Sequence, residues 1–129
     1  MKNQVGYNFD RPERGNYYEQ GCPILTALEI IGGKWKLPIL WNLAADKVSR
    51  YNELRRNMRG VTNIMLTKCL RELEQAGLVH REQYNEVPPR VEYSLTNEGL
   101  SLLPALNNLF DWGVGLQQKK SSAKINTDR

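Results

Sequence analysis

The pattern of hydrophobic and polar positions predicts a first short helix that opens at Cys22-Pro23. Proline is tolerated at the first position of a helix, where its missing amide hydrogen costs nothing. Helical spacing is shown by Ile24, Leu25, Leu28 and Ile31. Gly32 and Gly33 follow this pattern, and we expect them to end the helix.

The next segment, KWKLPILWNLAA, is apolar on almost every side and predicts a helix buried in the centre of the domain. Pro38 fits only within the first turn of that helix. A short extended link, Ser49 to Tyr51, leads to the segment YNELRRNM. Its apolar residues Leu54 and Met58 are four positions apart and predict one short amphipathic helix.

A second helix is predicted after the turn formed by residues 59 to 61. Thr62 is a good N-cap for the segment NIMLTKCLRELEQA, which ends at Gly77. Its inward stripe consists of Leu66, Cys69, Leu70 and Leu73. Its opposite face carries Asn63, Ile64, Thr67, Lys68 and Arg71.

The hydrophobic period then changes from helix to strand. Leu78 to Tyr84 and Arg90 to Leu95 predict a hairpin, whose loop contains the two prolines because proline cannot donate to a strand ladder. Thr96 is expected to cap one long helix, with Glu98 in its first turn. Its apolar stripe consists of Leu102, Leu103, Leu106, Leu109, Phe110 and Trp112.

Helix, turn, helix and hairpin is the order of a winged helix. We therefore predict a mainly α fold with a small β-hairpin (α+β), a winged helix-turn-helix domain over residues 21–118 with terminal dimerisation helices. The last apolar stripe is larger than a domain of this size needs for its own core. Residues 1–20 are expected to form a flexible arm and residues 119–129 a disordered tail, because both are polar and lack apolar periodicity.

Charge is concentrated in the middle of the chain. The formal net charge is +4, and six basic residues lie between Arg50 and Arg71 against one acidic residue, Glu53. A focused positive field favours a polyanionic partner. No stretch approaches a membrane span and the N-terminus has no secretory signal, so we expect a cytoplasmic protein without a membrane partner. The sequence suggests neither a cofactor nor a metal site.

Several blocks of sequence, in order, resemble the HxlR-type family of bacterial winged helix-turn-helix transcription regulators, which is related to the MarR regulators. The blocks are CPI, GGKWKLPIL, RYNELRR, MLTKCLRELEQAGLV and VPPRVEYSLT, and they extend from Gly21 to Gly113. The resemblance implies a dimeric DNA-binding fold whose terminal helices pair the subunits. It also implies, for some members, a sensor cysteine near the first helix, and Cys22 stands at that position.

A helix that enters the major groove needs short polar or cationic side chains on its outer face. Asn63, Thr67, Lys68 and Arg71, with Ile64 beside them, meet that need. Asn63 is a candidate for contacting adenine, and Lys68 and Arg71 are candidates for either guanine or phosphate. Without the family resemblance, a solvated helix face would be the more ordinary interpretation of these charges. The candidate contacts to the DNA backbone are Arg50, Arg55 and Arg56. Arg90, at the base of the wing, is a candidate for either the flanking minor groove or the backbone.

Cys22 precedes a proline-started helix, where the helix dipole favours a thiolate that oxidants and electrophiles attack. The alternative is an inert packed thiol. Cys69 faces the core and is interpreted as packing, although a bridge between Cys22 and Cys69 of two subunits is a second possibility. His80 lies alone on a solvent-facing strand position. The sequence places neither an acidic partner nor a second histidine with it, so we expect no enzyme.

The predicted function is a transcriptional regulator that binds double-stranded DNA as a homodimer at a palindromic operator, with recognition helices about 34 to 36 Å apart or more. Modification of Cys22 by an oxidant or electrophile is the predicted switch. The alternatives are a winged-helix protein-interaction module that never touches DNA and a thiol enzyme that uses Cys22.

Overall fold

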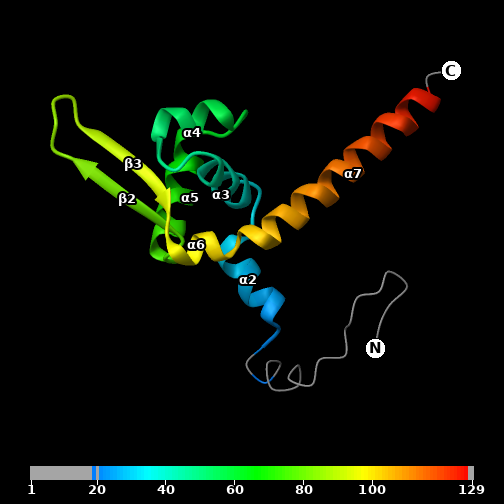
Figure 1. Ribbon diagram of the computed structural model, residues 1–129, viewed down its shortest axis with the longest axis horizontal. Helices are drawn as coiled ribbons and strands as arrows, with labels where there is room; N and C mark the ends of the chain where they lie inside the picture. Colours follow the sequence, from blue (N-terminus) through cyan, green and yellow to red (C-terminus); the bar gives the residue numbers. More distant parts are fainter. Residues whose placement is uncertain (1–18, 20, 128–129) are drawn as a thin grey trace. The chain divides into compact units, whose positions relative to one another are not determined.

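The computed structural model describes residues 19 and 21–127 (Figure 1). Contacts divide the chain into two compact units, Met1–Gly32 and Gly33–Arg129, and each is described by itself. Apart from Glu19, the arm expected over residues 1–20 lies outside the described residues.

The first unit contains helix α2, Pro23–Ile31, with the bounds that the sequence predicts. Cys22 is its N-cap in an extended conformation, and Pro23 stands where a missing amide hydrogen is harmless. The helix ends at Gly32, whose N–H donates to the Leu28 carbonyl oxygen at 2.7 Å. None of the α2 side chains is buried, and Ile24 is 68% exposed. Its apolar side therefore remains available to another surface.

The second unit contains five helices and a small antiparallel sheet within its described residues. The elements are α3 (Lys36–Ala45), β1 (Ser49–Arg50), α4 (Tyr51–Asn57), α5 (Asn63–Gln75), β2 (Val79–Tyr84), β3 (Arg90–Leu95), α6 (Asn97–Ser101) and α7 (Leu103–Thr127). The strand order is β1-β3-β2. The extended link predicted before α4 is thus a strand, paired with β3 through Ser49 and Tyr93.

Helix α5 begins and ends at the residues that its sequence predicts. The Thr62 hydroxyl oxygen accepts from the Met65 N–H at 3.1 Å, which satisfies one of the free amides of the first turn. At the other end, Gly77 has a φ of +81°, and the Leu78 N–H donates to the Leu73 carbonyl oxygen at 3.0 Å. This left-handed closure turns the chain directly into β2.

The core of the second unit forms where α3, α4, α5 and the base of the hairpin meet. Its fully buried side chains are Ile39, Leu40, Leu43, Leu54, Leu66, Leu70, Leu73 and Val79, with Ser49. The predicted inward stripe of α5, including Cys69, is confirmed as buried. The α3 helix is buried on one side only, since Trp35, Leu37 and Trp41 stay partly exposed, so the expectation of burial on nearly every side was too strong.

One long helix after Thr96 was predicted, and the structure has two. Thr96 does cap α6, because its hydroxyl accepts from the Gly99 N–H at 3.1 Å and donates to the Gly77 carbonyl oxygen at 2.6 Å. The helix breaks at Leu102. Pro104 explains the break, since it has no amide hydrogen and its ring would clash with the carbonyl of residue 100 in a continuous helix.

The expected disordered tail also needs correction. Helix α7 continues through Lys119 as far as Thr127. The polar composition that predicted disorder is compatible with a solvated last part of α7, which continues the apolar first part of the same helix. In the described part of the chain, no helix has both the length and the hydropathy needed to cross a membrane.

The buried face of α5 makes a testable contribution to stability. Leu66 is fully buried, so Leu66→Ala is expected to lower the free energy of unfolding by about 3 kcal/mol through lost burial and a residual cavity. Ile64→Ala on the same helix, at a side chain that is 83% exposed, is expected to change it by less than about 0.5 kcal/mol.

Urea denaturation at one fixed protein concentration measures both values, and an unchanged slope against urea confirms that the comparison is between equivalent transitions. Equal costs for the two variants would contradict the assigned orientation of α5.

Candidate nucleic-acid interface

The outer face of α5 is uncovered. All five residues predicted to point away from the core are exposed, and the apolar Ile64 is 83% exposed. These residues are Asn63, Ile64, Thr67, Lys68 and Arg71. The buried leucines on the opposite side fix the rotation of the helix about its axis, so this face is presented in one orientation.

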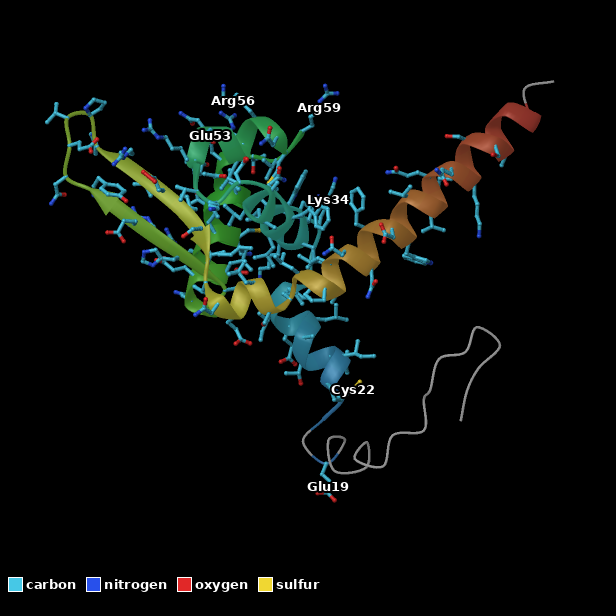
Figure 2. The ribbon with its side chains drawn as sticks, in the orientation of Figure 1. Glu19, Cys22, Lys34, Glu53, Arg56 and Arg59 are labelled. Carbon is cyan, nitrogen blue, oxygen red and sulfur yellow. The ribbon has the colours of Figure 1, made fainter. Side chains whose placement is uncertain are left out.

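A basic hollow lies where α4 meets the turn that leads to α5. Arg55 and Arg56 are in the last turn of α4, and Arg59 follows in the turn itself. Arg56 and Arg59 point away from the protein body (Figure 2). The hollow is lined by Asn52, Arg55, Arg56, Met58, Arg59, Gly60 and Val61. Arg59 was counted in the charge of this segment but was not predicted as a site residue.

A second hollow separates α5 from the hairpin, which runs beside it (Figure 1). Arg71 of α5 and Arg81 of β2 line this hollow, together with one carboxylate, Glu74. The other lining residues are Thr67, Leu70 and Tyr93. Sequence reasoning missed Arg81, although strand alternation relative to His80 places it on the side facing α5. The structure therefore adds a cation beside the predicted face.

Tyr51, the first residue of α4, links the two helices through its hydroxyl group. The hydroxyl oxygen lies 3.0 Å from Asn63 Oδ1, 3.2 Å from the Asn63 carbonyl oxygen and 3.3 Å from Thr67 Oγ1. Two of the predicted base-contacting residues thus share one hydrogen-bonding partner. Periodicity gave no signal for this contact, because it joins residues on different helices.

An ion pair fixes α5 to α3. Lys36 Nζ lies 2.7 Å from Glu72 Oε2, and the Lys36 side chain is only 11% exposed. The lysine, as hydrogen-bond donor and as nearby positive charge, lowers the pKa of Glu72 below its usual value, against a smaller opposing effect of burial. Glu72 is therefore ionised at neutral pH, and the pair joins α3 to the inner side of α5.

The chain matches the model of a known protein family. The HxlR-like helix-turn-helix model matches residues 30–121, which is most of the chain. The chain belongs to the HxlR-like helix-turn-helix family. This confirms the resemblance seen in the sequence blocks.

The relatives of this HxlR-family chain are regulators of transcription. It is 51% identical over 94 residues to the HTH-type transcriptional regulator YdeP of Bacillus subtilis, covering 73% of each chain. It is 48% identical over 116 residues to YybR of the same organism, covering 88% of this chain and 92% of YybR. The HxlR-family chain is thus a transcriptional regulator by descent, and its named relatives are not enzymes.

The redox regulator HypR has a similar solved structure. In its reduced form it matches with a TM-score of 0.72 at 44% identity, over 78% of this chain and 99% of HypR. Its oxidised form matches with a TM-score of 0.69 at 47% identity, over 73% of this chain and 96% of HypR. These matches confirm the winged helix-turn-helix fold class.

The wing of the HxlR-family chain holds Arg90 in a different setting from the other basic residues. Arg90 Nη2 lies 3.2 Å from Glu86 Oε1, and Arg90 Nε lies 3.3 Å from Glu92 Oε1 without hydrogen-bond geometry. The guanidinium also lies 4.1 Å from the centre of the Tyr84 ring. Two carboxylates thus offset the charge of Arg90. Arg50, by contrast, is exposed on β1.

The two cysteines of the HxlR-family chain have distinct surroundings. Cys22 lies half-buried at the N-terminal end of α2 (Figure 2), and its thiol caps no amide of that helix. Cys69 is buried in the inward stripe of α5, where burial, and secondarily the nearby Glu72 carboxylate, raises the pKa of its thiol. Cys69 is therefore protonated at neutral pH.

His80 lies on the exposed side of β2, as the sequence predicts, with Nε2 at 2.8 Å from Glu82 Oε2. Among the described residues, no three His, Cys, Asp or Glu side chains are grouped in a way that suits a metal ion.

The ion pair between Lys36 and Glu72 gives a pH-dependent prediction. Because the folded-state pKa of Glu72 is lowered, the pair stabilises the fold above the ordinary glutamate pKa of about 4.3, and this stabilisation is lost as the pH falls through the folded value. Glu72→Gln is expected to melt at a lower temperature than the parent at neutral pH, and the difference is expected to shrink progressively as the pH falls below the ordinary glutamate pKa.

Thermal denaturation followed by circular dichroism between about pH 7 and pH 3 measures the difference. Glu74→Gln, an exposed carboxylate on the same helix, serves as the control and should show no such pH-dependent difference. A Glu72→Gln deficit that persists unchanged at low pH would show that the ion pair is not its source.

Proposed function

We propose that this HxlR-family chain regulates transcription by binding double-stranded DNA sequence-specifically, as a homodimer at a palindromic operator. The observation that carries the proposal is the uncovered polar face of α5, held in one orientation by buried leucines. The major groove of B-DNA is wide enough for one helix, and such a face supplies the groups that read base edges. As a regulator of transcription, the protein acts in the cytoplasm beside the chromosome.

The α5 side chains take different roles in this proposal. Asn63 and Thr67, near the N-terminal end of the helix, contact base edges by hydrogen bonds, and Ile64 contacts the methyl group of a thymine. Lys68 and Arg71 lie further along the face and bind guanine or phosphate. The high exposure of Ile64 supports its role, since an apolar side chain gains by being covered on binding.

The arginines outside α5 contact the phosphate backbone of the DNA in this proposal. Arg55 and Arg56, with Arg59 added by the structure, line one open hollow with the positive charge that attracts phosphate oxygens, and Arg50 lies just before α4. Arg90 is paired with two carboxylates, so we propose that it shapes the wing and contributes least to phosphate binding.

Two exposed apolar surfaces support a homodimer. On α2, large apolar side chains are left uncovered within their unit, and on α7 Trp112 is 65% exposed. The other uncovered apolar side chains of α7 are Leu109, Phe110 and Leu116. Exposed large apolar side chains gathered on one helix in this way mark an interaction site. A second copy that covers it by two-fold symmetry would present two copies of α5 to a palindrome.

DNA binding gives a prediction about salt. Arg56→Ala is expected to weaken binding to a fluorescein-labelled mixed-sequence duplex by roughly tenfold. It should also reduce the slope of log affinity against log salt by about two per dimer, because each protomer loses one phosphate contact worth about 0.9. Fluorescence anisotropy over a potassium chloride series measures both quantities.

Lys119→Ala is the matched control, since it removes the same charge from the exposed surface of α7. It should leave the slope close to that of the parent. If the parent protein shows no salt-dependent binding of duplex DNA, the alternative of a winged-helix protein-interaction module is favoured instead.

We further propose that thiol modification at Cys22 changes DNA affinity. Cys22 is the more accessible of the two cysteines, whereas Cys69 is buried with a raised pKa. The similar protein HypR is a redox regulator with solved oxidised and reduced forms. Modification at the start of α2 would alter the surface that we assign to the dimer, and so the spacing of the two α5 helices that a palindrome requires.

The switch predicts a difference between the cysteines. Diamide, which oxidises thiols to disulfides, is expected to reduce DNA affinity of the parent and of Cys69→Ser by at least about tenfold, a coupling of the usual size for linked sites. Cys22→Ser should not respond. Anisotropy before and after diamide, then after dithiothreitol, measures the effect and its reversal.

An unchanged diamide response in Cys22→Ser would refute the switch. Loss of the response in both cysteine variants would indicate a bridge between Cys22 and Cys69 of two subunits.

A further inference from the structure

We propose that Tyr51 determines which hydrogen-bonding groups α5 presents to DNA, so that Asn63 acts as a donor and Thr67 as an acceptor. This inference rests on the proposed DNA-binding function and adds a specificity-determining residue to it. Tyr51 acts here as a positioning residue, because its own hydroxyl is occupied by the two side chains that it orients.

The geometry places one hydroxyl among three oxygen atoms. Tyr51 is half-buried at the start of α4, while Asn63 and Thr67 are exposed one turn apart on α5. The two Asn63 atoms near the hydroxyl, Oδ1 at 3.0 Å and the carbonyl oxygen at 3.2 Å, are both acceptors. The third, Thr67 Oγ1 at 3.3 Å, belongs to a hydroxyl that can donate or accept.

Only one arrangement of protons uses all of these contacts. A phenol has a single proton, and the Asn63 oxygens can only accept it, so Tyr51 donates to Asn63. The contact to Thr67 then requires the threonine hydroxyl to donate to the Tyr51 oxygen. The bond from Tyr51 turns Oδ1 of Asn63 toward α4, so that this side chain directs its amide N–H groups outward. Thr67, whose proton is used in the bond to Tyr51, directs oxygen lone pairs outward.

This polarity selects among bases. An asparagine that pairs with adenine uses Oδ1 to accept from N6 while its N–H donates to N7. With Oδ1 turned toward the Tyr51 hydroxyl, the Asn63 amide presents its N–H groups and instead matches guanine, which offers two acceptors, N7 and O6. Thr67, as an acceptor, matches the exocyclic amino group of cytosine or adenine. The preference for guanine over adenine at the Asn63 position therefore depends on a hydroxyl that does not touch DNA.

Tyr51→Phe removes that hydroxyl and keeps the ring. Sequences bound from random duplex DNA are selected with the parent, with Tyr51→Phe and with Asn63→Ala, and the position that loses preference in Asn63→Ala identifies the base contacted by Asn63. The parent is expected to select guanine there. Tyr51→Phe is expected to shift the ratio of adenine to guanine at that position by about tenfold towards adenine, because the Asn63 amide is then free to turn Oδ1 as well as its N–H groups toward a base.

Two further variants isolate the effect. Tyr84→Phe makes the same chemical change at a tyrosine whose hydroxyl is not hydrogen-bonded to another described residue, and the selected motif should not change. Thr67→Val leaves the bond from Tyr51 to Asn63 in place, so it should relax its own position while guanine is kept at the Asn63 position. In the Asn63→Ala background, Tyr51→Phe should have no further effect at that position.

The outcomes separate this inference from the proposed function. A parent protein that selects no motif overturns both. A parent that selects a motif, together with a Tyr51→Phe variant that selects the same bases in the same ratios, overturns only the role of Tyr51. A uniform loss of affinity with a smaller salt slope would mean that Tyr51 binds phosphate, which also overturns it. Thermal denaturation of Tyr51→Phe verifies that the folded protein is compared in each case.

Discussion

The burial of the leucine face of α5 is the constraint on which the rest of this protein depends. Leu66, Leu70 and Leu73 are almost completely removed from water, and the helix has no other apolar face to bury. This fixes the rotation of α5 about its axis, so that its five outer residues point to solvent. The cap at Thr62 and the left-handed glycine at Gly77 set where this face begins and ends. A DNA-reading surface needs such a rigid support, because a displacement of one ångström removes a hydrogen bond to a base.

Helix α3 connects this support to the surface assigned to the dimer. On one side Lys36 reaches Glu72 of α5, and on the other Trp41 stacks on Phe110 of α7, with ring centres 4.7 Å apart. A shift of α7 relative to α3 would therefore be transmitted through packed side chains to α5, the helix that we propose reads DNA. The two hollows beside α5 are lined by arginines from separate elements, so the positive field of the site is also a product of how these helices and strands pack.

Much of the fold could be predicted because its signals are local. The spacing of apolar residues, with the Thr, Gly and Pro residues at element ends, predicted the bounds of α2, α4, α5 and the hairpin to within a residue or two. The exposed face of α5 followed from the position of its leucines. The failures are equally local in origin. The apolar residues after Thr96 keep helical spacing on both sides of Pro104, and this spacing predicted one continuous helix. The proline interrupts the helix, which breaks at Leu102. The polar composition after Lys119 predicted disorder, whereas the structure continues α7 there as a helix without an apolar stripe.

The sequence by itself therefore determined which residues of α5 are buried and which are exposed, since that information is carried by neighbours three or four positions apart. Only the tertiary structure decided which residues meet across elements: Tyr51 with Asn63 and Thr67, Lys36 with Glu72, and the strand pairing of Ser49 with Tyr93. Such contacts depend on the relative placement of helices and strands, which periodicity within one element does not record. For this reason the location of the site was readable from the chain, whereas the hydrogen-bonding character of its side chains was not.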